Sequence, residues 1–144
     1  MKTVGMASDH AGYELKEALK PLVASLGYKI KDFGTDSTES MDYPDTAHPL
    51  GYAIENGEVD LGIAICGSGN GISMTLNKHQ GVRAALCWLP ELGALARQHN
   101  NANVLSLPAR FITLETAREV VKAFFAASFE GGRHQRRVEK IPCK

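Results

Sequence analysis

Short apolar runs alternate along the chain with longer segments in which apolar residues recur every three or four positions. The short runs are typical of buried strands, and the three- and four-residue steps are typical of amphipathic helices. Strands are predicted at 4–7, 28–33, 61–66, 83–88 and 104–107. Helices are predicted at 15–26, 46–56, 72–78, 90–99, 114–129 and 133–141.

Two segments depart from this pattern. Pro21 lies within the first predicted helix and is expected to kink or interrupt it, because proline has no backbone donor and its ring clashes with the preceding turn. The polar segment 34–45 has no periodicity and contains Asp42-Tyr43-Pro44-Asp45. A connection of this length in a compact domain is more often functional than idle, so 34–45 is a candidate functional loop.

Five strands separated by helices predict an α/β fold, an open, mostly parallel five-stranded sheet with helices on both faces. The 144 residues make a single domain, 1–144, with room for one sizeable core. Ligands bind such sheets at the carboxyl ends of the strands, near the point where the strand order reverses. This rule selects Asp9-His10, the loop 66–71 and the ends of the fourth and fifth strands as the candidate site.

Composition excludes several classes of protein. Hydrophobic residues make up 44% of the chain and charged residues 22%, which is too apolar for a disordered protein. The 16 basic and 16 acidic residues give a formal net charge of zero, which argues against a broad nucleic-acid-binding surface. No apolar run reaches the roughly 18 residues of a membrane span, and the first residues lead into a predicted strand instead of a signal peptide. We therefore expect neither a nucleic-acid nor a membrane partner.

The cysteines favour a reducing compartment. Cys66, Cys87 and Cys143 are odd in number and show no CxxC spacing. Neither a disulfide framework nor a structural zinc site is therefore expected. We predict a cytoplasmic protein with no metal ligand set.

Charge is distributed unevenly behind the balanced total. Residues 1–130 hold 11 basic and 15 acidic side chains, a net of −4, whereas residues 131–144 hold five basic side chains and one acidic, a net of +4. A short cationic tail of this kind is often only the solvated face of a helix.

The arginines of this tail nevertheless suggest a binding site. Arg133 and Arg137 are four positions apart and share one face of the last predicted helix. Two guanidinium groups on one face can hold a phosphate through their fork-shaped donors. Arg110, just after the fifth strand, is a third candidate, whereas Arg136 and Lys140 lie around the helix and are expected to face solvent.

The histidines divide in the same way. His10 follows the first strand, and His99 ends the fourth helix beside a run of asparagines, so both are candidates for a site. A lone histidine is more often structural than functional, and that interpretation stays open for both. His48 and His79 have no such context and are expected on the surface.

The segment Cys66-Gly67-Ser68-Gly69-Asn70-Gly71 carries the most chemical information. Alternating glycines between a strand and a helix let backbone N–H groups converge on an anion, although a tight turn alone could also need them. A Walker A loop would need Gly-Lys-Ser/Thr, and a nucleophile elbow would need glycines two positions before and after Ser68. The dinucleotide fingerprint belongs to the first strand–helix unit, and a phosphatase loop would close with an arginine where this chain has Ile72.

What remains is a thiol beside a nest of backbone donors. Such surroundings favour the thiolate form of a cysteine, which can act as a nucleophile or as a general base. The donors can stabilise a developing oxyanion by roughly 3–4 kcal/mol each. A base beside an oxyanion hole suits proton abstraction next to a carbonyl, and the alternative is that Cys66 is only a small core residue.

These motifs occur in an order and spacing that resemble one family over essentially the whole chain. The matching segments are Ser8-Asp9-His10-Ala11-Gly12, Asp42-Tyr43-Pro44, Ile65-Cys66-Gly67-Ser68-Gly69-Asn70-Gly71-Ile72-Ser73, Asn77-Lys78, Arg97-Gln98-His99-Asn100 and Glu130-Gly131-Gly132-Arg133-His134. The chain resembles the type B ribose-5-phosphate isomerases, a family shared with the galactose-6-phosphate isomerase subunits.

The resemblance implies a Rossmann-like sheet, a homodimer or dimer of dimers, and no cofactor or metal. It implies interconversion of ribose 5-phosphate and ribulose 5-phosphate through a cis-enediol, a step of the pentose phosphate pathway. Cys66 matches the base, and His99 matches the residue that assists ring opening from the neighbouring subunit. The substrate-binding residues implied are Asp9, His10, Tyr43, Gly67, Ser68, Gly69, Asn70, Gly71, Asn100, Arg110, Arg133 and Arg137.

Their implied roles differ. The backbone of 67–71 with Asn100 matches the anion hole for the enediolate, and the Ser68 hydroxyl matches a substrate contact. Asp9 matches a ligand of the sugar. The phosphate contacts implied are His10, Arg110, Arg133 and Arg137.

Some positions depart from the family pattern. Cys66 and Ile72 place the chain in the cysteine-based group, since other members lack the cysteine and carry a glutamate after the last loop glycine. Asn101 stands where many members have aspartate, and Pro108-Ala109 precedes Arg110 where glycine is common. These positions leave the sugar preference undecided, and a six-carbon substrate such as allose 6-phosphate or galactose 6-phosphate is the main alternative.

Two other classes are weaker alternatives. A non-catalytic sugar-phosphate sensor would keep the arginines and lose the base, but Cys66 and His99 are both present. A nucleotide-binding module would need a loop lysine and an acidic ribose partner, which the sequence does not supply at the usual spacing.

Overall fold

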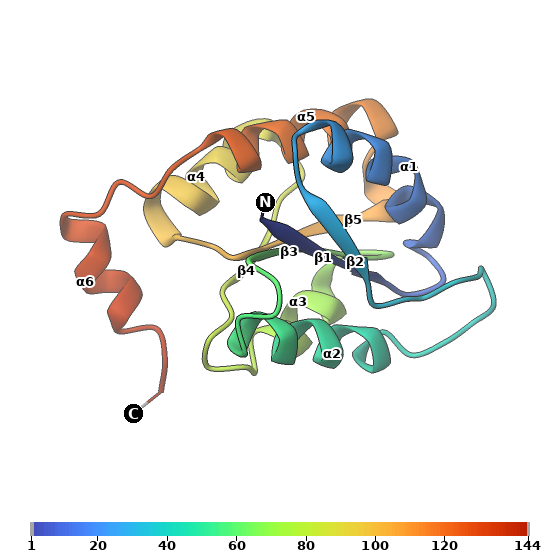
Figure 1. Ribbon diagram of the computed structural model, residues 1–144, viewed down its shortest axis with the longest axis horizontal. Helices are drawn as coiled ribbons and strands as arrows, with labels where there is room; N and C mark the ends of the chain where they lie inside the picture. Colours follow the sequence, from blue (N-terminus) through green and yellow to red (C-terminus); the bar gives the residue numbers. More distant parts are fainter. Residues whose placement is uncertain (1, 144) are drawn as a thin grey trace.

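All five strands run in the same direction, because a helix carries the chain back across the sheet between each strand and the next. The computed structural model describes residues 2–143 (Figure 1). The strands are β1 (Thr3–Ser8), β2 (Lys29–Asp32), β3 (Leu61–Cys66), β4 (Ala84–Leu86) and β5 (Val104–Pro108). The helices are α1 (Tyr13–Ser25), α2 (Pro44–Glu55), α3 (Asn70–Leu76), α4 (Pro90–Asn100), α5 (Leu114–Ala126) and α6 (Arg133–Glu139), with a short 3₁₀ turn at Ala109–Phe111. The predicted fold is confirmed, and the sheet is parallel throughout.

The strand order creates a switch point beside the candidate site. The sheet is ordered β2-β1-β3-β5-β4, so the chain leaves β1 toward one edge and returns at β3 on its other side. Ser8 at the end of β1 pairs in register with Ile65 of β3. Asp9, which follows β1, and Cys66, which ends β3, therefore lie at adjacent strand ends, where such folds bind ligands.

Two apolar cores flank the sheet, because alternate residues of each strand point to opposite faces. Met6 and Ile63 pack under α1, α4 and α5, which cover one face. Ala7, Ala64 and Cys66 pack against α2 and α3 on the other face, as the two layers in Figure 1 show. The Cys66 side chain therefore belongs to the α2–α3 side of the sheet.

Element bounds differ from the prediction in a few places. Helix α1 runs through Pro21 without interruption, so the expected break is wrong. Pro21 lies on the exposed side of the helix, where a missing backbone bond is tolerated because water can satisfy the free carbonyl. Helix α2 starts at Pro44, two residues before its predicted start, since the fixed φ of proline suits the first helical turn.

The expectation that His79 lies on the surface is also wrong. His79 is buried, and its Nδ1 lies 2.8 Å from Oε1 of Glu55 while its Nε2 lies 2.8 Å from Nδ1 of His48. Gly51 on α2 makes room for this ring, because a Cβ there would stand 2.6 Å from Cδ2 of His79. His48, on α2, is partly buried, and its contact with His79 joins α2 to the turn after α3.

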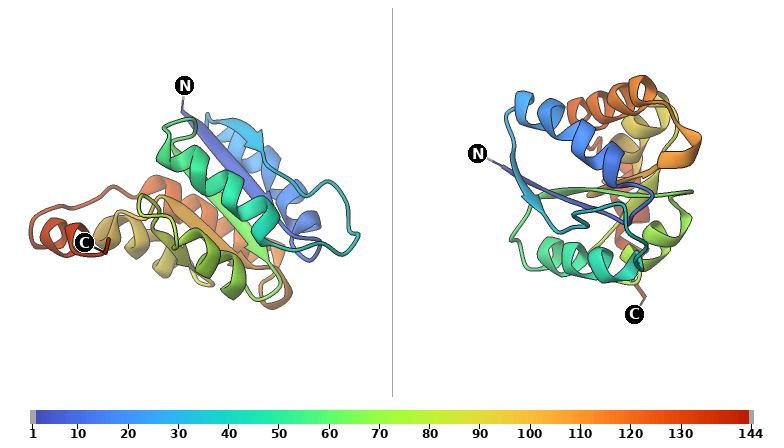
Figure 2. Two further views of the ribbon diagram at one scale, coloured as in Figure 1. Left: turned by 90° about the horizontal axis from the view of Figure 1, so that it is seen from below. Right: turned by 90° about the vertical axis from the view of Figure 1, so that its right-hand side faces the viewer.

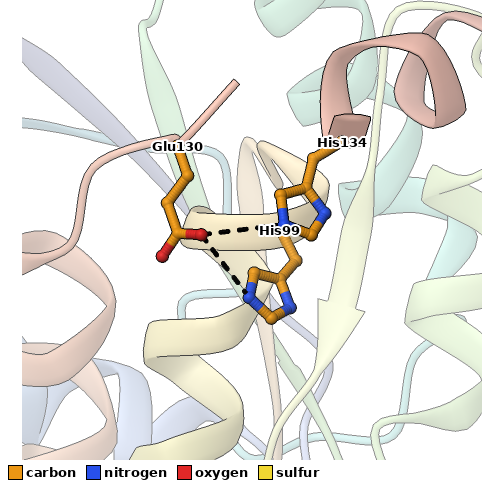
Figure 3. Close-up of side chains that lie close together, drawn as sticks. All are labelled: His99, Glu130 and His134. Carbon is orange, nitrogen blue, oxygen red and sulfur yellow. Dashed lines mark ion pairs between the residues drawn. The ribbon is translucent and has the colours of Figure 1, made fainter. Parts of the chain in front are cut away.

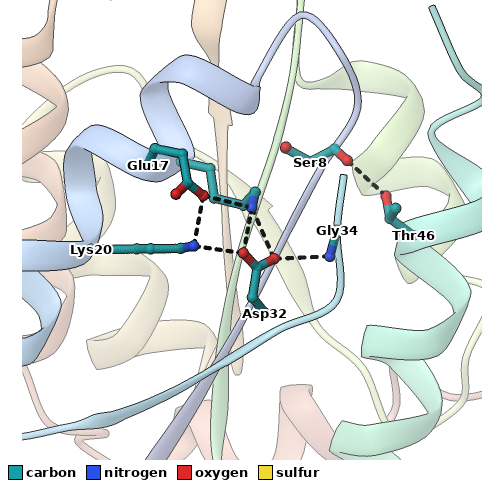
Figure 4. A network of polar contacts seen from close by, with 7 residues as sticks. Ser8, Glu17, Lys20, Asp32, Gly34 and Thr46 are labelled. Carbon is teal, nitrogen blue, oxygen red and sulfur yellow. Dashed lines mark hydrogen bonds and ion pairs between the residues drawn. The ribbon is translucent and has the colours of Figure 1, made fainter. Parts of the chain in front are cut away.

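A buried lysine ties the segment after β2 to the end of β1 (Figure 4). Lys16 is fully buried, and its Nζ donates to both oxygens of Asp32 at 2.8 and 2.7 Å. Asp32 also accepts from the Gly34 amide at 2.8 Å, and the Gly34 carbonyl accepts from the amide of Ser8. Although burial opposes the charged form, hydrogen bonds from Lys16, Lys20 and the Gly34 amide hold the pKa of Asp32 below its usual value.

Helix α6 extends away from the body of the molecule, as the left view of Figure 2 shows, and among the elements of residues 2–143 it packs most closely against α4. Within residues 2–143, no helix combines the length and apolarity needed to span a bilayer.

Candidate active site

The thiol of Cys66 lies at the carboxyl end of the central strand β3, where the glycine-rich loop begins. Cys66 is the last residue of β3 and only 4% exposed. Gly69 has a φ of +77°, a conformation that glycine adopts without strain, and it caps α3. Ser68 and Asn70 are exposed beside it, and the Asn70 amide donates to the Ser68 hydroxyl oxygen at 3.2 Å. The loop therefore presents polar groups to solvent next to a shielded sulfur.

Two glycines of this loop allow side chains from elsewhere to approach. A Cβ on Gly67 would stand 3.1 Å from Nη1 of Arg110, and the Arg110 amide donates to the Gly67 carbonyl at 3.0 Å. A Cβ on Gly71 would collide with the ring of Tyr43, which precedes α2. Arg110 and Tyr43, both predicted as substrate-binding residues, thus lie against the loop.

Asp9 and His10 are fixed at the neighbouring strand end. The Asp9 amide donates to the Ile65 carbonyl at 3.2 Å, and its buried Oδ1 accepts from the Gly12 amide at 3.1 Å. His10 Nδ1 accepts from the Met41 amide at 3.1 Å, so the ring's remaining proton sits on Nε2. The candidate loop 34–45 therefore sets the tautomer of a predicted phosphate contact.

An apolar hollow of about 350 Å³ adjoins the same loop. Trp88 and Phe111 in its wall are 51% and 75% exposed, and large apolar side chains exposed together are typical of a binding surface. The sequence selected the ends of the fourth and fifth strands but singled out neither residue, although Trp88 ends the predicted strand 83–88 and Phe111 lies four residues beyond the predicted strand 104–107. The residues that line the hollow are Ser68, Asn70, Leu86, Trp88, Pro108 and Phe111.

The other predicted site residues lie at the opposite end of the sheet. Helix α4 runs back against the strands, so His99 and Asn100 at its end fall beside the amino ends of the strands. Arg133 and Arg137 lie on α6, beyond the same end (left in Figure 1, and again in the left view of Figure 2). Within one chain, the fold does not bring these four residues to Cys66.

His99 belongs to a cluster that sequence reasoning did not find (Figure 3). Its ring stacks on that of His134 at 4.2 Å between centroids, and the rings are tilted by only 11°. Oε1 of Glu130 lies 3.7 Å from Nε2 of His99 and 3.6 Å from Nε2 of His134. Burial, together with the nearby His99 and Arg133, lowers the pKa of His134. The sequence did contain one signal for this cluster: Glu130 and His134 are four positions apart, a spacing at which side chains can meet.

The other cysteines have different surroundings from Cys66. Cys87 directly follows β4 and is buried. Burial raises the pKa of its thiol to about 11, so the thiol stays protonated at neutral pH. Cys143 is exposed near the end of the chain. Of the three, Cys66 stands at the switch point.

Comparison with known proteins places this architecture in a family. The chain matches the family described as Ribose/Galactose Isomerase over residues 4–141. It is 45% identical to ribose-5-phosphate isomerase B of Escherichia coli over 141 residues, which is 98% of this chain and 95% of that protein.

Solved structures show the same fold at similar identity. A ribose 5-phosphate isomerase from Thermotoga maritima is 47% identical with a TM-score of 0.95, over 98% of this chain and 97% of that one. Ribose-5-phosphate isomerase B from Mycoplasma genitalium, with bound ribulose-5-phosphate, is 43% identical with a TM-score of 0.91, over 96% and 93%. The chain belongs to the Ribose/Galactose Isomerase family. It is an enzyme of the aldose–ketose isomerase class.

Proposed function

We propose that this protein interconverts D-ribose 5-phosphate and D-ribulose 5-phosphate through a cis-enediolate, with Cys66 as the base. The observation that carries this proposal is the position of Cys66. Its thiol ends β3 at the switch point, beside a glycine loop against which the Arg110 guanidinium lies. A base, backbone donors and a cation together suit a small phosphorylated carbonyl compound.

The reaction begins with ring opening. Ribose 5-phosphate is mostly a closed furanose, and His99 moves a proton between the ring oxygen and the anomeric hydroxyl to free the aldehyde. The imidazole ring of His99 stacks on the ring of His134, and this contact orients it for proton transfer.

Proton transfer then occurs on the open chain. The Cys66 thiolate removes the C2 proton, and the electron pair forms the C1–C2 double bond while charge moves to O1. The same sulfur returns the proton to C1 as the proton on O2 passes to O1, which leaves a ketone at C2. The amides of 67–71, the Ser68 hydroxyl and Asn100 hold the two oxygens, a contribution of about 3 kcal/mol for a well-placed donor.

Binding groups surround this centre. Asp9 accepts hydrogen bonds from sugar hydroxyls, and the Tyr43 ring closes one side of the loop. The phosphate is held by Nε2 of His10 and by Arg110, with Arg133 and Arg137 completing the site. No cofactor or metal is required in this scheme, because C1 is reduced as C2 is oxidised and the reaction balances internally.

The working enzyme is a homodimer or a dimer of dimers with the site shared between subunits. Cys66 ends β3, whereas His99 and Arg137 lie on α4 and α6 at the opposite end of the sheet; this separation supports the arrangement, since a second copy can supply the missing half. The exposed Trp88 and Phe111 beside the loop supply apolar surface for such an interface. The enzyme acts in the cytoplasm, in the pentose phosphate pathway.

A substrate panel tests this function. Purified protein in EDTA is assayed for ketose formation from ribose 5-phosphate, allose 6-phosphate and galactose 6-phosphate. We expect the highest kcat/KM on ribose 5-phosphate. A higher value on either six-carbon sugar would replace the proposed substrate, and no ketose from any of the three would overturn the function.

A further inference from the structure

We propose that His99, Glu130 and His134 form a binding site for a divalent transition-metal ion of the Zn²⁺ type, and that the bound ion inhibits the isomerase. The three ligand atoms all lie within 4.8 Å of one another. Two imidazoles and one carboxylate are a common ligand set for zinc, which then keeps a fourth position for water. The inhibitory part rests on the proposed function, because it assigns His99 to ring opening.

The distances are close to those of a coordinated ion. Ligands about 2.0–2.1 Å from a tetrahedral ion stand roughly 3.4 Å apart. Oε1 of Glu130 is already 3.7 Å from one Nε2 and 3.6 Å from the other. The two rings are stacked, so their lone pairs run side by side, and one ring must turn out of the stack before both can point at one ion.

The backbone fixes the approach of the three elements. The Glu130 amide donates to the Gln98 carbonyl at 3.0 Å, which joins the segment after α5 to the last turn of α4. The His134 amide donates to the Gly131 carbonyl at 3.0 Å, which sets the start of α6 beside it. The ligands therefore come from three separate elements whose main chains are already in place (Figure 3).

The side chains keep the freedom that ion entry requires. Glu130 is 52% exposed and His99 41% exposed, so an ion can reach them from solvent and the His99 ring can turn out of the stack, whereas His134 is 12% exposed. Arg133 and Arg137 carry like charge nearby, but both are exposed, so water and salt screen their repulsion.

A bound ion would use the Nε2 lone pair of His99. We assign the proton exchange of ring opening to this nitrogen, so a metal ion bound there would stop ring opening. Ribulose 5-phosphate has no free hydroxyl for a five-membered ring, so its conversion needs no opening step. Inhibition should therefore be stronger with ribose 5-phosphate than with ribulose 5-phosphate.

The first test measures binding directly. Chelator-treated protein is titrated with CoCl₂, followed by the visible d–d absorbance of tetrahedral Co²⁺, and with ZnCl₂ in a calorimeter. We expect one ion per chain, and Glu130→Gln and His134→Gln should each weaken binding by at least about tenfold. Glu139→Gln, which removes an exposed carboxylate from the same helix, and Cys143→Ser, which removes an exposed thiol, should bind as the wild type does.

Binding that is equally strong in His134→Gln, or absent in the wild type, overturns the site whatever the protein's activity. The second test measures isomerisation with and without ZnCl₂, each variant against its own metal-free rate. Zn²⁺ can also bind the Cys66 thiolate and inhibit the enzyme there. The readout that distinguishes the two sites is the loss of inhibition in His134→Gln and Glu130→Gln. Equal inhibition in these variants and the wild type overturns the inhibitory role.

Discussion

The two ends of the sheet carry different kinds of functional group. At the carboxyl end, Cys66 and Asp9 are almost fully buried and held by main-chain hydrogen bonds from neighbouring strands. At the amino end, His99 is 41% exposed, and Arg133 and Arg137 are exposed on α6, a helix that packs mainly on α4. The fold buries and fixes the groups at the carboxyl end, whereas it leaves His99 partly exposed and the two arginines exposed at the amino end.

This difference suggests a division of labour. Proton abstraction needs a base and oxyanion donors fixed to within about 0.5 Å, and a sheet edge supplies such rigidity. Phosphate binding and ring opening tolerate groups delivered on a helix, since charge acts over a longer range and guanidinium forks can adjust. Variants at the two ends should therefore fail in different kinetic parameters.

The largest effect is expected at the carboxyl end. Cys66→Ala removes the base, so kcat should fall about 1,000-fold while KM changes little. Cys87→Ala and Cys143→Ser are the matched controls, and both should keep wild-type kcat. Steady-state kinetics on ribose 5-phosphate make the measurement, and a Cys66→Ala enzyme with more than a tenth of the wild-type kcat would contradict the role.

A smaller effect of another kind is expected at the amino end. Arg137→Ala removes a charged donor from the phosphate, which should raise KM about 10–100-fold. Arg136→Ala removes the same charge from the neighbouring position and should leave KM unchanged. If the two variants raise KM equally, the effect comes from net charge and the phosphate contact is wrong.

The smallest effect on activity is expected behind the carboxyl end. Asp32→Asn leaves buried Lys16 with Glu17 as its one carboxylate partner among residues 2–143, so the free energy of unfolding should fall by about 1–2 kcal/mol, less than for a fully buried pair because Asp32 is a third exposed. The pKa of Asp32 is lowered in the folded protein. Its contribution is therefore complete above its ordinary value of about 4 and disappears as pH falls through the lower folded value.

Denaturant melts of wild type and Asp32→Asn between pH 7 and pH 3 make this measurement. The gap in unfolding free energy should narrow toward the acid limit. Asp36→Asn, at a position for which residues 2–143 show no ion pair, is the control and should show no such gap. A gap that widens on acidification would mean that Asp32 is not a stabilising anion.

The sequence predicted which residues meet at the carboxyl end of the sheet, but it did not predict where the residues of the amino end lie. Parallel strands bring their ends together by rule, so Asp9, His10 and Cys66 could be grouped from strand positions alone. The place of His99 depends on the direction of α4. The contact of His99 with Glu130 depends on a single main-chain bond to Gln98, which no periodicity encodes.

Other misses have similar causes. His79 is buried because Gly51 leaves room for its ring, and such space arises only when α2 and the turn after α3 pack together. Continuity of α1 through Pro21 depends on which side of the helix faces water. Local patterns report local structure, whereas these features depend on contacts between distant segments.

We propose that each active site takes Cys66 from one chain and His99 from another, and subunit complementation can show whether the two residues act together. Cys66→Ala and His99→Asn are each purified, mixed, unfolded and refolded together, and assayed on ribose 5-phosphate. Random pairing makes half of the dimers hybrid, each with one intact site, so the mixture should regain about a quarter of wild-type activity. A refolded mixture no more active than the two variants separately would contradict the shared site.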